Sequence, residues 1–205
     1  LSEHSNNIFM NPYFFAKVEK LHNEIDNLGL SQEQKMVLKK MYKSFVKNGV
    51  ALDETSQARM REINKELSSL EFTFGNNLLA ENNAFADRFG LSISEYAGTM
   101  ASTEDRALRE EMFKAYSSRG NNGNEYDNKE LILKIMALRI EKAKLLGYET
   151  PASFILSDKM AGTPEAVDTF LAGLMAPAVA KAREEVADMQ TIMDEDVKAG
   201  LLPEG

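Results

Sequence analysis

Hydrophobic residues recur three or four positions apart along most of the chain, which is the spacing of a helix that buries one face. A serine, threonine, asparagine, aspartate or proline stands before most of these stripes, and glycine or a polar turn follows many of them. The pattern therefore predicts an almost wholly helical chain. The predicted helices run from Asn11 to Gly29, from Ser31 to Gly49, from Asp53 to Ala84, from Ser102 or Thr103 to Arg119, from Asp127 to Gly147, from Pro151 to Lys159, and from Thr163 to at least Ile192.

Some of these helices carry a second local signal. Ser31 with Gln34, and Asp127 with Glu130, have the spacing of a capping box, in which two side chains satisfy the first backbone N–H groups. The last and longest helix contains a proline, which predicts a kink near Gly173–Pro177.

One segment departs from the helical spacing. Between Arg88 and Ser94, the apolar residues Phe89, Leu91 and Ile93 alternate with small or polar ones, which is typical of a short strand or an extended connector. The predicted fold class is therefore all-α, an irregular multi-helix array with long helices and at most one short strand or hairpin near 88–94. We treat residues 1–205 as a single helical region of a larger protein, with a candidate sub-boundary near 86–102.

Composition narrows the function classes. The chain has no cysteine, which excludes disulfides, a thiolate nucleophile and cysteine-bound zinc or iron–sulfur clusters. Its 24 basic and 32 acidic residues give a net charge of −8, which argues against nucleic acid as a partner. No apolar run approaches the roughly 18 residues of a membrane span, so we expect no membrane partner. The opening LSEHSNNIFM does not resemble a signal peptide, and we interpret both ends as cuts in a longer polypeptide.

The histidines do not form a recognisable metal motif. A zinc site of the helical-peptidase type needs two histidines four residues apart, a glutamate as general base and a further ligand. The chain has only His4 and His22, and the stretch His22–Asp26 lacks the second imidazole. We therefore predict no catalytic, cofactor-binding or metal-binding residue within these 205 residues.

Two acidic clusters lie near the C-terminus, Glu184-Glu185 with Asp188 and the triplet Asp194-Glu195-Asp196. Their carboxylates could hold a hard cation, but the alternating ligands and the turn glycine of a calcium loop are missing. We interpret both clusters as solvated helix surface. The triplet would oppose the helix dipole in a last turn, which favours a helix that ends before it.

The turn Arg119–Gly123 suggests an anion-binding nest before a helix N-terminus, although a glycine-terminated helix with a polar turn is the favoured interpretation. Tyr116, Tyr126 and Tyr148 lie near such turns and could contact a peptide, but a tyrosine at a helix end more often bridges core and solvent. No nucleophile or phosphate-loop motif occurs. The residues alone support a scaffold, lid or interaction module.

Four phrases of the chain form a recognisable series: SSLEFTFGNNLLAENNAF (Ser68–Phe85), EDRALREEMFKAYSSRG (Glu104–Gly120), DNKELILKIMALRIEKAKLLGY (Asp127–Tyr148) and the segment Ala152–Glu165. In the same order they resemble segments of the thimet-oligopeptidase-like zinc metallopeptidases, which include peptidyl-dipeptidase, oligopeptidase A and neurolysin. The peptidyl-dipeptidase branch is the most similar.

The resemblance implies the N-terminal helical part of a zinc enzyme whose helices flank a narrow channel for short peptides, with the zinc on an H-E-x-x-H helix elsewhere. We therefore expect a channel-wall or lid segment, inactive alone, with zinc in the full-length parent and none in this fragment. The expected partners are short peptides and the remaining catalytic half of the polypeptide, and the expected location is the cytoplasm, with the periplasm as the alternative. The alternative function is a non-catalytic helical module that binds peptides or proteins.

The chain departs from the family between Phe85 and Phe89, where relatives carry a longer stretch and this chain has only Ala86-Asp87-Arg88. Either a channel-side excursion is shortened here or residues are missing. Helices meant to face an absent catalytic half would also leave apolar surface exposed, so a homodimer of the fragment through its long helices is a further expectation.

Overall fold

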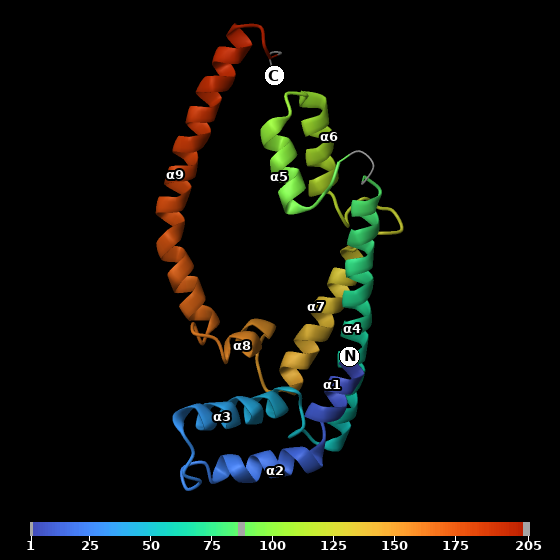
Figure 1. The fold of residues 1–205 in the computed structure, drawn as a ribbon, viewed down its shortest axis with the longest axis vertical. Helices are drawn as coiled ribbons and strands as arrows, with labels where there is room; N and C mark the ends of the chain where they lie inside the picture. The colour runs from blue at the N-terminus through green and yellow to red at the C-terminus, as the bar shows by residue number, and fades with distance from the viewer. Residues whose placement is uncertain (1, 86–88, 203–205) are drawn as a thin grey trace. The chain divides into compact units, whose positions relative to one another are not determined.

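The computed structural model describes residues 2–85 and 89–202, which form helices joined by turns and short connectors, with no strand among them (Figure 1). The all-α prediction is therefore confirmed. In chain order the helices are α1 (Ser2–Phe9), α2 (Pro12–Asn23), α3 (Gln32–Lys47), α4 (Glu54–Asn83), α5 (Ile93–Ser102), α6 (Arg106–Ser117), α7 (Lys129–Leu145), α8 (Pro151–Leu156) and α9 (Pro164–Lys198).

Two compact units divide the chain, residues 1–151 and residues 152–205. The division follows the start of α8 and does not coincide with the sub-boundary expected near 86–102. The assignment of all 205 residues to one region of a larger protein stays a prediction. In the described ranges, no helix offers a hydrophobic stretch of the length that a membrane span requires.

Most helix starts follow the local signals in the sequence. The Asn11 Oδ1 accepts hydrogen bonds from two backbone N–H groups of the first turn of α2, and Ser31 and Gln34 form the complete capping box of α3. Asp53 caps α4 by accepting from the backbone N–H of Ser56 at 2.9 Å. These starts are predictable because each cap involves residues within one turn of each other.

The segment 89–94 is an extended connector followed by a helix rather than a strand. Ser92 and Glu95 form a capping box, so Ile93 is the first residue of α5 and lies exposed. Phe89 and Leu91 are both buried, which explains the alternation that suggested a strand. The expected position Arg88 lies outside the described residues.

Two helix starts differ from the prediction. The helix expected from Ser102 or Thr103 is α6, and it begins later, after Asp105, whose Oδ1 accepts from the N–H groups of its first turn. Ser102 is instead the last residue of α5, a helix that the sequence pattern did not predict. The capping box of Asp127 does not form either. Asn128 is the N-cap of α7 without a side-chain hydrogen bond, because its amide is bound elsewhere.

The centre of the first unit is the pairing of α4 with α7, which lie side by side in Figure 1. Four buried side chains make its core, and Leu70 and Leu145 pack against them. An ion pair closes one end, where Arg59 donates to the Glu141 carboxylate at 2.6 and 2.8 Å. Arg59 holds the pKa of Glu141 below its usual range. The four core residues are Ile63, Leu67, Ile135 and Leu138.

A second core joins the far end of α4 to the α5–α6 pair. Phe89 and Leu91 of the connector pack with Met112 and Ala115 of α6, and Phe85 adds its ring from the end of α4, stacked on Phe89. The connector is therefore held by its buried aromatic and aliphatic side chains. This packing places α6 and the turn after it next to the last turns of α4.

The second unit consists of α8 and α9 with their connections. Thr163 caps α9 by accepting from the N–H of Ala166, and the helix continues through Pro177 to Lys198. No side chain of α9 is buried, and its large apolar residues are exposed. The exposed set is Phe170, Leu171, Leu174, Met175, Val179, Val186, Met189, Ile192 and Met193.

Candidate functional site

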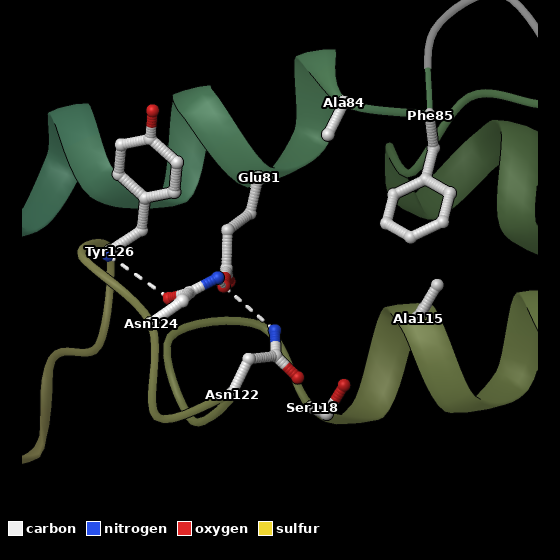
Figure 2. Close-up of a pocket in the computed structure, with 8 residues that line it drawn as sticks. All are labelled: Glu81, Ala84, Phe85, Ala115, Ser118, Asn122, Asn124 and Tyr126. Carbon is white, nitrogen blue, oxygen red and sulfur yellow. Dashed lines mark hydrogen bonds between the residues drawn. The ribbon is translucent and has the colours of Figure 1, made fainter.

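A buried carboxylate, that of Glu81 near the end of α4, organises the loop between α6 and α7. Glu81 is 4% exposed. One of its oxygens accepts the backbone N–H of Gly120, and the other accepts the side-chain amides of Asn122 at 2.7 Å and Asn124 at 3.2 Å. All three donors are neutral, and none of the described residues forms an ion pair with Glu81. Figure 2 shows the carboxylate pointing from α4 toward this loop.

The sequence brings Glu81 to this place through helix periodicity. Phe74, Leu78, Glu81 and Phe85 follow one another at spacings of four, three and four, so Glu81 lies on the stripe that faces the rest of the unit. The loop reaches it because Gly120 turns the chain with φ of +70°. A side chain at this glycine would also crowd the Asn128 amide, whose nitrogen lies 3.1 Å from where a Cβ would stand.

Asn128 fixes the other end of the loop. It is 1% exposed, and its backbone N–H donates to the Gly120 carbonyl at 2.8 Å. Its side-chain amide donates to the carbonyl of Phe74 and accepts from Asn77, both on α4. The side-chain amide of Asn128 therefore both donates to α4 and accepts from it, while its backbone N–H closes the loop onto Gly120.

Arg119 connects three segments beside the Glu81 contact. Its guanidinium donates to the Asn82 side chain on α4 at 3.2 Å and to the Leu91 carbonyl in the connector at 3.0 Å. The same group lies 4.0 Å from the centre of the Tyr116 ring, which stacks on the Tyr96 ring of α5 at 4.1 Å. The end of α6 is thus tied to α4, α5 and the connector at once.

A cavity of about 300 Å³ lies between the end of α4, α6 and the loop. Its polar side is formed by Glu81, Asn122, Asn124, Ser118 and Tyr126. Its apolar side is formed by Ala84, Phe85 and Ala115, and Figure 2 shows the Phe85 ring and the Ala115 methyl facing each other there. The cavity therefore combines a buried negative charge with an apolar wall.

Asp127 holds the loop in a pH-dependent way. It pairs with the Lys129 ammonium at 2.7 Å and accepts from the backbone N–H groups of Lys129 and Gly123, and these contacts lower its pKa to about 2. Because the folded pKa lies below the unfolded one, the stabilisation is complete above about pH 4, declines below it and is lost as the pH falls through the folded pKa of about 2. We expect Asp127→Asn to destabilise the chain at pH 6 and to have a much smaller effect near pH 2. Urea unfolding of the wild type and the variant between pH 2 and pH 6 measures their free energies of unfolding. A difference between the two that does not change with pH would contradict the prediction.

The candidate anion nest at Arg119–Gly123 does hold an anion, but this anion is the Glu81 carboxylate of the same chain. Tyr116 is used in the aromatic stack with Tyr96, and Tyr126 lines the cavity. Tyr148 follows α7 and lies half-buried, away from the cavity lining. The structure therefore brings only Tyr126, of the three tyrosines, into the site.

The histidines and acidic clusters do not come together. His22 on α2 stacks on the Tyr42 ring of α3 at 4.0 Å, and His4 lies exposed on α1. Among residues 2–85 and 89–202, no three histidine or carboxylate side chains are placed to share a metal ion. The donor set that a catalytic zinc requires is thus not provided by the described residues.

The acidic triplet lies inside α9, which continues to Lys198, so the expectation that the helix ends before the triplet is wrong. Lys198 in the last turn places a positive charge at the negative end of the helix dipole and offsets part of the repulsion. The Glu184–Asp188 cluster is exposed on the same helix, where Lys181 pairs with Glu184 at 3.1 Å. Both clusters are solvated helix surface, as we interpreted them.

Sequence reasoning did not single out Glu81, Asn82 or Asn128. Glu81 could have been found, because a carboxylate at a stripe position has to be buried with donors or leave the helix face. Asn128 offers no such signal, since an asparagine next to a helix start usually caps that helix.

Comparison with known proteins assigns the chain to a family. Residues 99–202 match the model of Peptidase family M3. The chain is similar to dipeptidyl carboxypeptidase of Escherichia coli (strain K12), with 27% identity over 226 residues, covering 95% of this chain and 33% of that protein. It is similar to oligopeptidase A of Haemophilus influenzae, with 30% identity, 93% of this chain and 33% of that protein. Saccharolysin of Saccharomyces cerevisiae is 26% identical over 90% of this chain and 29% of that protein.

The chain spans about a third of the length of these relatives. The alignment with the Escherichia coli protein is longer than the chain itself, so that relative carries residues that this chain lacks. The place where we expect them, Ala86-Asp87-Arg88, lies outside the described residues. The family model covers more than half of the residues, and the chain belongs to peptidase family M3.

Proposed function

We propose that this chain is the N-terminal channel-wall or lid segment of a zinc-dependent oligopeptidase, similar to a peptidyl-dipeptidase, that hydrolyses short peptides. Membership of peptidase family M3 supports the peptidase chemistry, and the names of the relatives, dipeptidyl carboxypeptidase and oligopeptidase A, support peptides as substrates. The zinc and its ligands belong to another part of the polypeptide, and this segment is inactive alone. The proposed location is the cytoplasm.

The observation that carries this proposal is that α7 is apolar on two faces. Ile135 and Leu138 are buried against α4, whereas Ile132, Met136 and Ile140, spaced by four, lie between 40% and 47% exposed on another face. A helix needs only one apolar face to pack against a single neighbour, so a second apolar face is available for another contact. The exposed stripe of α7 is therefore a surface that the rest of the enzyme would cover.

The second unit supports the same conclusion. Its long helix α9 exposes apolar side chains along most of its length, and the only other helix among the described residues of this unit is the six-residue α8. Contiguous exposed apolar surface of this kind marks an interface. We propose that the occupant is the remaining catalytic part of the same polypeptide, and a homodimer of the fragment is the competing outcome.

Reconstitution of the enzyme from two pieces tests the proposal. The 205-residue chain and the remaining two thirds of the parent are purified separately, mixed with zinc and assayed on a short quenched-fluorescent peptide. Neither piece alone should cleave the peptide, and the mixture should cleave it until a chelator is added. Cleavage by the 205 residues alone would refute the proposal, because the fragment would then carry its own active site. The absence of a complex between the pieces would also refute it and would favour a non-catalytic binding module.

A pair of matched variants locates the interface. Met136→Asp places a charge in the exposed stripe of α7, and we expect at least tenfold weaker association with the catalytic piece because the carboxylate would be desolvated. Ala107→Asp adds the same charge at an exposed position on α6 and serves as the control. Equal association of both variants would place the interface elsewhere.

A further inference from the structure

The cavity beside Glu81, here called the Glu81 pocket, has the features of a small-molecule site that the proposed channel-wall role does not use. It is lined by the residues already given, five polar and three apolar, in a volume of about 300 Å³. Figure 2 shows the Glu81 carboxylate between the Tyr126 ring on one side and the Phe85 ring on the other. A concave site with an apolar wall and few convergent polar groups is typical of ligand binding.

The charge balance of the pocket is incomplete. Buried charges in proteins are usually paired with an opposite charge or bound to a metal ion. Glu81 receives three neutral donors, and Arg119, the nearby cation whose contacts are given above, directs its guanidinium at Asn82, Leu91 and the Tyr116 carbonyl instead. A carboxylate that lines a cavity and lacks a cation in the described chain is the expected partner of an external cation.

We propose that the Glu81 pocket binds a primary ammonium group carried on a small apolar body. The ammonium would donate to Glu81 and to the Ser118 hydroxyl oxygen, which keeps acceptor capacity because its hydroxyl donates to the Lys114 carbonyl at 2.7 Å. The apolar body would lie against Phe85, Ala84 and Ala115. The proposal is independent of peptidase activity, since it concerns only residues of this chain.

A metal ion fits the pocket less well than an ammonium does. Calcium and magnesium require six or more oxygen ligands, several of them charged. Glu81 is the only carboxylate among the described residues that line the pocket, and the side-chain amides of Asn122 and Asn124 turn their N–H groups toward it. An ammonium needs only two or three acceptors, which the pocket provides.

The experiment is a titration of the ¹⁵N-labelled 205-residue chain with n-butylammonium chloride at constant ionic strength, followed by NMR. The Gly120 amide is the reporter because it donates directly to Glu81. We expect a saturable shift of this resonance, and at least tenfold weaker binding of 1-butanol and of tetramethylammonium, which lack the charge and the N–H donors respectively. Equal shifts with all three compounds, or no saturable shift, would overturn the proposal.

Two dipeptides distinguish the biological source of the ammonium. Ala-Ala has a free amino terminus, and N-acetyl-Ala-Ala does not. Binding of Ala-Ala but not of its acetylated form identifies a peptide N-terminus as a ligand, whereas binding of butylammonium alone identifies a free amine. Both results support an ammonium site, and binding of the acetylated peptide as tightly as the free one contradicts it.

Variants separate a ligand site from a purely structural carboxylate. Glu81→Gln removes the charge and should weaken butylammonium binding at least tenfold, while Glu110→Gln removes an equal charge from the exposed surface of α6 and should leave it unchanged. Ala84→Leu reduces the cavity at an exposed position without touching the carboxylate, so it remains informative even if Glu81→Gln unfolds the loop. If Ala84→Leu and a folded Glu81→Gln both bound butylammonium as tightly as the wild type, Glu81 would only anchor the loop.

Discussion

Glu81→Ala is expected to destabilise the chain by about 3 kcal/mol and to free the loop between α6 and α7. The substitution leaves the Gly120 N–H and the amides of Asn122 and Asn124 without their acceptor. An unsatisfied buried donor costs about 1–3 kcal/mol, and the two asparagine side chains can turn to water while the backbone N–H of Gly120 cannot. Gly120 is buried, so its desolvation dominates the loss.

Urea unfolding followed by circular dichroism measures this effect, and hydrogen exchange of the Gly120 amide reports on the loop itself. Glu110→Ala is the matched control, because Glu110 is an exposed residue of α6 paired only with Lys114 of the same helix. The control should unfold like the wild type. If Glu81→Ala changed the free energy of unfolding as little as Glu110→Ala does, the loop would be held by Asn128 and Arg119 alone.

The second large effect is expected at Ile135, one of the four core residues between α4 and α7. Ile135 is 7% exposed, and truncation to alanine removes three buried carbon atoms and leaves a cavity. Substitutions of this kind cost about 2–5 kcal/mol, and we expect about 3 kcal/mol here because Leu67 and Leu138 pack around the side chain.

Ile132→Ala on the same helix is the control. The substitution is chemically identical, but Ile132 is 47% exposed, so the expected cost is less than about 0.5 kcal/mol. Thermal unfolding of both variants compares them directly. Similar melting temperatures for the two variants would mean that α7 does not bury the face seen in the structure.

The same pair distinguishes folding from assembly. If the exposed stripe of α7 is covered by the catalytic part of the enzyme, Ile132→Ala should weaken reconstitution without changing the stability of the isolated chain. Ile135→Ala should do the reverse at temperatures where it stays folded. The two faces of one helix would then serve two different interfaces.

The elements that could be predicted from the sequence are those whose causes are local. The starts of α2, α3 and α4 depend on Asn11, Ser31 and Asp53, each of which bonds to backbone groups within three residues. The apolar stripes of α4 and α7 likewise mark the faces that pack against each other, whereas the stripe of α9 is exposed. The all-α class follows from these two kinds of information.

The parts that could not be predicted depend on contacts between distant residues. Glu81 and Gly120 are 39 positions apart, and Asn77 and Asn128 are 51 apart. Asn128 is diverted from capping α7 by its contacts with α4, which no local rule contains. The connector with Phe89 and Leu91 looked like a strand because burial of alternate residues arises equally from packing against α6.

Pro177 gives α9 a mechanical property that its sequence position explains. A proline has no N–H, so the carbonyl of Gly173 receives no hydrogen bond from it, and Gly173 itself contributes no side chain to stiffen that turn. Helix α9 therefore bends most easily near Pro177, between its two exposed apolar portions, one from Phe170 to Met175 and the other from Val186 to Met193. A small change of angle at the proline lets the two apolar portions contact differently oriented parts of a partner surface. The whole helix can therefore pack against a surface that is not straight.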